Sequence, residues 1–133
     1  MHRILVAALC VLSVASCGSD PNDSPRAHLA QLELRSVREL LQQRPFAANI
    51  PRTPNTVPCG PVAWPQNAPG FSELGYHPTY VTPFSLAVSN DTHAGQTVIT
   101  AYADHDCDHV YATYEMAVDG EGAGVLRVSA GDE

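Results

Sequence analysis

The stretch from Tyr80 to Val118, YVTPFSLAVSNDTHAGQTVITAYADHDCDHVYATYEMAV, contains three runs of branched and aromatic residues that are typical of β-strands. These runs cover 80–88, 96–103 and 110–118, and a fourth follows at 125–129. Short segments rich in Gly, Asn and Asp separate them. Because connections this short favour hairpins, the sequence predicts an antiparallel sheet of about four strands. Pro83 predicts that the first strand begins after it or lies at an edge.

One helix is predicted before the sheet, from Pro25 to Arg44. Ser24 is a typical N-cap, and the residue before Pro45 avoids the helical conformation, which ends the helix at Arg44. Glu33 lies on the apolar side, and we expect its carboxylate to reach the rim beside Arg44. The apolar face has Leu32 and Leu34 at its margins and is formed by Leu29, Ala30, Val37, Leu40 and Leu41. The sequence therefore predicts an α+β fold, with one N-terminal amphipathic helix packed on the sheet.

The segment 45–70 contains seven prolines, which leave no room for a regular element of any length. We expect an ordered loop instead, held on the core by its apolar residues Phe46, Ile50, Val57 and Trp64.

The first residues have the pattern of an export signal. Two positive residues, His2 and Arg3, precede an apolar run that ends at Ala15 and is too short for a permanent membrane span. The sequence that follows, Val14-Ala15-Ser16-Cys17, resembles the lipobox of bacterial lipoproteins. In that family the Cys thiol is alkylated by a diacylglyceryl group, the chain is cut before it, and the new amine is acylated.

The resemblance implies a signal peptide at 1–16, a lipidated tether at 17–24 and a single domain at 25–133. Acyl chains such as palmitate on Cys17 would hold the protein on the membrane, since several chains are needed for stable anchoring. The alternative is a plain secretory signal with an incidental Cys. Gly18 follows the Cys where an Asp favours inner-membrane retention, so we expect the outer membrane of the cell envelope rather than the inner one.

The composition excludes several partners. The chain has 7 basic and 14 acidic residues, a net charge of −7, and none of the basic residues is Lys. Without a basic patch, the protein is a poor candidate for binding nucleic acid or anionic lipid. After loss of the leader, Cys59 and Cys107 are the two cysteines left beside Cys17, and in an exported protein they are predicted to form a disulfide. Two free buried thiols or a metal site are the alternatives.

The run Asp104-His105-Asp106-Cys107-Asp108-His109 is the densest group of ligand-type residues. As a calcium loop, Asp104, Asp106 and Asp108 would occupy the first, third and fifth places, but His109 replaces the turn Gly and Glu115 falls in a strand. As a zinc site, His105, Cys107 and His109 would need Cys59 as well. We expect instead an acidic turn whose Asp side chains accept from neighbouring backbone amides, so no cofactor is predicted, with calcium as the alternative.

Residues 25–120 resemble the globular half of type IV pilin-like proteins. That family has a phrase like F-x-x-L-G-F-x-P before its first strand and a turn like A-x-A-D-x-D-G-D-G-V between later strands. Here the chain departs from the turn by replacing its two glycines with Cys107 and His109, and a lipoprotein-type start stands in place of the prepilin leader. The resemblance is carried by Phe71-Ser72-Glu73-Leu74-Gly75-Tyr76 with Pro78, Phe84, Thr100-Ala101-Tyr102-Ala103 and the segment 104–114.

Taken together, these patterns predict a non-enzymatic, lipid-anchored envelope protein with a structural or protein-binding role. Its partners would be envelope, secretion or pilus proteins. No G-x-S-x-G motif occurs, and nothing selects His77 or His93 as a catalytic base. The alternatives are a small metal-binding or hydrolytic lipoprotein that uses the turn at 104–109, and a pseudopilin-like part of an export machine.

Overall fold

The computed structural model describes residues 24–44, 49–91 and 95–129. Helix α1 (Pro25–Gln43) begins as predicted, because the Ser24 hydroxyl caps it by accepting from the Ala27 amide at 3.0 Å. Its buried face differs in detail from the prediction: Leu34 is fully buried, whereas Leu29 is 51% exposed. Two alanines, Ala27 and Ala30, are also fully buried, and their small side chains let the helix approach the sheet closely.

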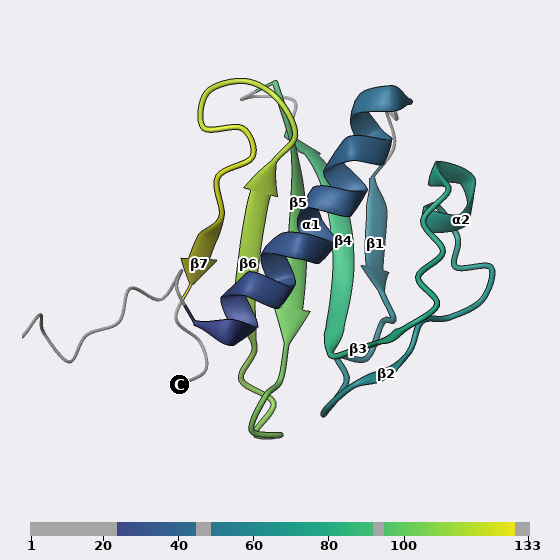
Figure 1. Cartoon of the computed structure of the whole chain (residues 1–133), viewed down its shortest axis with the longest axis vertical. Coiled ribbons are helices and arrows are strands. Elements are labelled where there is room, and N and C mark those ends of the chain that lie inside the picture. The colour runs from purple at the N-terminus through teal and green to yellow at the C-terminus, as the bar shows by residue number, and fades with distance from the viewer. Residues whose placement is uncertain (1–23, 45–48, 92–94, 130–133) are drawn as a thin grey trace, which may run out of the picture.

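The main sheet has five antiparallel strands in the order β1-β4-β5-β6-β7, and α1 lies across one of its faces, over β5 and β6 (Figure 1). This arrangement confirms the predicted α+β class and antiparallel sheet. Four strands correspond to the four predicted runs. Their bounds are Phe84–Asp91 for β4, Gln96–Ala103 for β5, Ala112–Ala117 for β6 and Arg127–Ser129 for β7.

The core lies between α1 and the sheet face beneath it. Cross-strand pairs such as Leu86 with Ala101 and Ile99 with Met116 are buried on that face. Pro83 separates β4 from the preceding residues, so the strand begins at Phe84, as its position predicted.

The prediction of no regular element in 45–70 was wrong. Within it lie β1 (Ile50–Thr53), which forms one edge of the sheet, and β2 (Val62–Ala63). Proline is tolerated in β1 because the strand is at an edge and its register with β4 shifts between Ile50 and Thr53, around Pro51. The expected apolar anchors Ile50, Val57 and Trp64 are buried, whereas Phe46 lies outside the described residues.

Two short elements complete the fold, and neither is predicted from the sequence. Helix α2 (Phe71–Leu74) has Phe71 and Leu74 buried, and β3 (Val81–Thr82) pairs with β2 as a small ribbon apart from the main sheet (Figure 1). The chain that leads from α2 through β3 approaches α1 before it enters β4, because Thr82 hydrogen bonds to Glu33 of that helix. This segment, 76–82, forms part of the candidate site.

Candidate functional site

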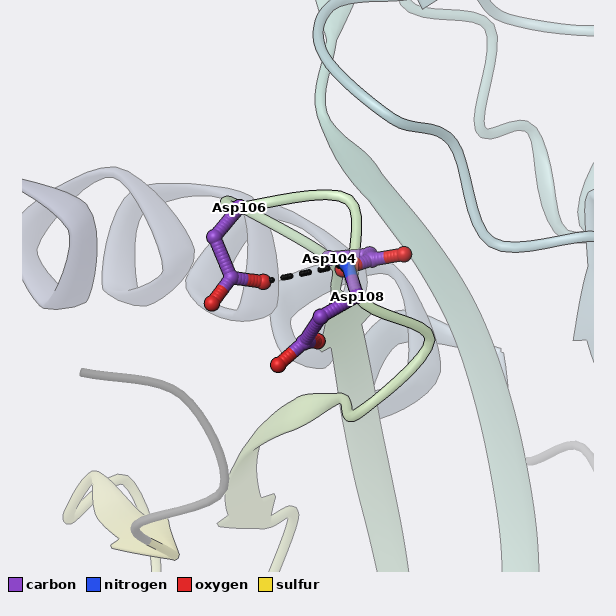
Figure 2. Close-up of side chains that lie close together, drawn as sticks. All are labelled: Asp104, Asp106 and Asp108. Atoms are coloured by element: carbon purple, nitrogen blue, oxygen red, sulfur yellow. Dashed lines mark hydrogen bonds between the residues drawn. The ribbon is translucent and has the colours of Figure 1, made fainter.

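The acidic turn between β5 and β6 is organised around Asp104, which is 2% exposed. One carboxylate oxygen accepts from the Asp108 amide at 3.1 Å, and the other accepts from the His109 amide at 3.2 Å. The side chain thus spans the turn and satisfies two backbone donors. Figure 2 shows Asp104, Asp106 and Asp108 projecting from this one loop.

The other two aspartates are also engaged with the backbone of the turn. Asp106 accepts from the Asp108 amide at 3.2 Å (Figure 2), and Asp108 accepts from the Val110 amide at 2.7 Å. This pattern confirms the predicted acidic turn with self-bonded aspartates. The three carboxylates each offer an oxygen within 4.8 Å of the others, which is close enough to share a cation. Glu115, the twelfth position of a calcium loop, lies inside β6, as predicted.

Two residues of the turn, Cys107 (φ 63°) and His109 (φ 66°), have left-handed backbone conformations. These are the two positions at which the pilin-like turn carries Gly, and such a conformation is costly for other residues. The turn is held there by covalent and hydrogen bonds. Cys107 is joined to Cys59 by a disulfide with a Cα–Cα distance of 5.2 Å, and the His109 amide donates to Asp104.

The disulfide confirms the predicted pairing and links the loop after β1 to the turn before β6. It also removes both thiols from the alternative zinc site. His105 interacts instead with Tyr114, at 3.2 Å between Nε2 and the hydroxyl. Among the residues that the structure describes, the only cluster of metal-ligand type is the aspartate trio.

A second polar group is buried beneath α1 and includes Glu33. The sequence had predicted that this residue reaches the rim beside Arg44. That expectation was wrong. Glu33 is only 5% exposed, and one of its carboxylate oxygens has no hydrogen-bond partner. Burial raises the pKa of Glu33 to about 7, and a hydrogen bond from the Thr82 side chain opposes the shift. Thr82 is itself buried and accepts from the Phe84 amide at 3.2 Å.

Tyr76 lies on the same side of α1 and is 5% exposed. Its hydroxyl has no partner at hydrogen-bonding geometry, although Tyr80 lies near enough to affect it. Burial raises the pKa of Tyr76, and the influence of Glu33 and Tyr80 adds to the shift. Glu33, an acid on the apolar side of the predicted helix, was the only sequence signal for this group. Tyr76 and Thr82 come from a segment without clear periodicity, so the sequence did not indicate them.

A cleft of about 480 Å³ lies next to this group, between residues 63–67 and 77–81. Its lining combines aromatic, amide and imidazole side chains, including Trp64, Asn67, His77 and Tyr80. Trp64 is fixed by edge-to-face contacts with Phe71 and Tyr76, at ring-centroid distances of 5.3 and 5.2 Å. The cleft is bordered by exposed apolar side chains: Val62 (41% exposed), Tyr80 (52%) and Val81 (61%).

Comparison of the chain with protein-family models, with curated proteins and with solved structures gives no match. Cys17 and the leader before it lie outside the described residues. Within the described part, no helix has the length and hydropathy needed to cross a membrane. The lipobox and the pilin-like resemblance therefore stay predictions.

Proposed function

We propose that this protein is a non-enzymatic, lipid-anchored component of the bacterial cell envelope, more specifically of the outer membrane, that binds or scaffolds other envelope proteins. The observation that carries the anchor is the sequence Val14-Ala15-Ser16-Cys17 at the end of an apolar run. The disulfide between Cys59 and Cys107 supports export, because such bonds persist in oxidising compartments. The antiparallel α+β fold supports the pilin-like resemblance of the domain.

The binding role is supported by the surface around the small ribbon. Val62, Tyr80 and Val81 expose apolar side chains beside a neutral cleft, and such mixed surfaces are typical of protein contacts. The acidic turn does not support a second function to the same degree, because its carboxylates already accept from backbone amides. The partners we expect are envelope, secretion or pilus proteins.

The anchor is tested by mass spectrometry of the chain recovered from the membrane fraction of its bacterial host. We expect a mature protein that begins at Cys17 and carries the diacylglyceryl and acyl groups. Cys17→Ala should abolish the modification, whereas Cys10→Ala, a cysteine inside the leader, is the matched control and should leave it unchanged. An unmodified Cys17 in the wild-type membrane fraction would overturn the proposal.

The binding role is tested by crosslinking in intact cells. Val81 and Val125 are similarly exposed, at 61% and 59%, but only Val81 borders the cleft. Val81→Asp should remove the crosslinked envelope partners, and Val125→Asp should retain them. Equal crosslinking in both variants would contradict a binding role for the ribbon and leave the anchor proposal unaffected.

A further inference from the structure

The polar group under α1 is unusual because two of its atoms are buried without partners. The Glu33 carboxylate and the Tyr76 hydroxyl each contribute one such atom. Buried polar atoms without partners are costly, so a native fold that keeps them calls for an explanation. Both atoms lie where segment 76–82 meets the helix, and Thr82 of that segment hydrogen bonds to Glu33.

We propose that Glu33 and Thr82 form a proton-controlled latch that holds segment 76–82, and with it one wall of the cleft, against α1. In its neutral form, Glu33 carries no charge, so burial of its unpartnered oxygen costs far less than burial of an ionised carboxylate. The other carboxyl oxygen accepts from Thr82. The neutral acid therefore keeps its hydrogen bond with Thr82 and leaves no buried charge.

Ionisation of Glu33 has the opposite effect, because the charge would be buried without a counter-ion. Segment 76–82 contributes two phenols, Tyr76 and Tyr80, and the exposed imidazole of His77. The strands beneath the helix present apolar side chains and Tyr114, which is paired with His105. Within the described ranges, no cation offsets the burial of Glu33. Glu33 must therefore either keep its proton or, once ionised, be reached by water.

When Glu33 ionises, segment 76–82 separates from α1, and the helix stays on the sheet. Helix α1 is fixed on the sheet by a face of fully buried side chains that includes Leu34 and Val37. The segment is attached more weakly: β3 is two residues long, and four of the seven residues are exposed, namely His77, Thr79, Tyr80 and Val81. Weakly attached segments with few buried contacts open locally at lower free energy than the core.

Opening of the segment changes the cleft, since residues 77–81 form one of its two walls. The opposite wall includes Trp64, which contacts the ring of Tyr76. A proton on Glu33 thus keeps the cleft in its closed shape, and loss of that proton favours release of the wall. The latch belongs to the domain and operates whether or not Cys17 carries lipid.

Hydrogen exchange on the purified full chain tests the latch, with correction for the intrinsic pH dependence of exchange. The Tyr76 amide is a suitable reporter because it donates to the Phe71 carbonyl at 2.9 Å within this region. Between the ordinary pKa of 4.5 and the raised value of about 7, opening releases a proton. The opening constant should therefore rise by up to about tenfold per pH unit, or about 40-fold from pH 5 to pH 7.

Glu33→Gln should remove this pH response in segment 76–82, whereas Glu39→Gln, an exposed acid on the same helix, is the matched control and should keep it. Amides of β5 should not follow the response in either protein. Equal responses in wild type and Glu33→Gln would overturn the latch, as would a flat wild-type profile. If Glu33→Gln does not fold, NMR titration of the wild-type Glu33 carboxyl decides: a pKa below about 5 overturns the latch.

Discussion

The acidic turn and the Glu33 group use polar side chains in opposite ways. The turn gathers three aspartates, of which Asp104 is buried and the other two are exposed, and their contacts with backbone amides close it. The Glu33 group places one acid under a helix and leaves a carboxylate oxygen and a tyrosine hydroxyl without partners. The dense cluster is therefore structurally complete, whereas the lone acid responds to protons.

The difference shows that a high density of ligand-type residues is a poor guide to which group of this chain is chemically responsive. A carboxylate that accepts from backbone amides holds the loop in place. A carboxylate in an apolar setting is held neutral and becomes sensitive to pH.

The largest effect is expected at the disulfide, which fixes the acidic turn to the loop that follows β1. Reduction, or joint substitution of Cys59 and Cys107 by Ser, should lower the free energy of unfolding by about 3–4 kcal/mol, since the bond spans 48 residues of chain. The melting temperature should fall by about 10 °C or more. A free-thiol assay on the denatured, non-reduced mature protein, in which we propose that Cys10 is removed and Cys17 carries lipid, is the check, and two reactive thiols would contradict the bond and reopen the metal hypothesis.

The Glu33 group should make stability depend on pH. Below pH 4.5 the acid is protonated in both states, and between 4.5 and about 7 only the folded state keeps the proton. The free energy of unfolding should therefore fall by about 1.4 kcal/mol per pH unit over this window, about 3 kcal/mol in all, and change no further above it. Urea unfolding at pH 4.5, 6 and 7.5 measures the effect. Glu33→Gln should lose this component, and an unchanged pH profile in that variant would assign it elsewhere.

Much of the fold follows from local sequence signals, and the exceptions have physical causes. The Ser24 cap, the break at Pro83 and the strand runs depend on adjacent residues, so pattern and propensity suffice for them. Strand β1 was missed because its stability comes from pairing with β4, a partner more than thirty residues away, which no local pattern encodes. The shift in the buried face of α1 also depends on the sheet that the helix meets.

The candidate site divides in the same way. The turn at 104–110 was predictable, because Asp side chains bond to backbone amides only a few residues along the chain. The role of Glu33 was not, since its burial depends on where segment 76–82 crosses the helix. Predictions about charged residues on an apolar helix face therefore need the tertiary structure.

Within the turn, Asp104 should matter far more than its neighbour Asp106. Asp104→Ala leaves the amides of Asp108 and His109 without their buried acceptor and should cost about 2 kcal/mol. Asp106→Ala is the matched control: Asp106 is exposed and shares the Asp108 amide with Asp104, so the loss should be about 0.5 kcal/mol. Thermal unfolding of both variants gives the comparison. Equal losses would mean that burial of Asp104 is not what closes the turn.

The smallest effect is expected from calcium, although the three aspartates lie close enough to share an ion. A tight site needs a Gly at the sixth place and a bidentate acid at the twelfth. Here His109 occupies the sixth place, and Glu115, at the twelfth, is held inside β6 opposite Thr100. Four of the six carboxylate oxygens already accept from the turn amides, so an ion would compete with the bonds that shape the loop. At 1 mM calcium the melting temperature should rise by less than about 2 °C, which corresponds to a dissociation constant of about 1 mM or weaker. Isothermal titration of wild type and Asp106→Asn is the decisive measurement: micromolar affinity that the substitution abolishes would make the acidic turn, and not the Glu33 group, the chemically active region of the domain.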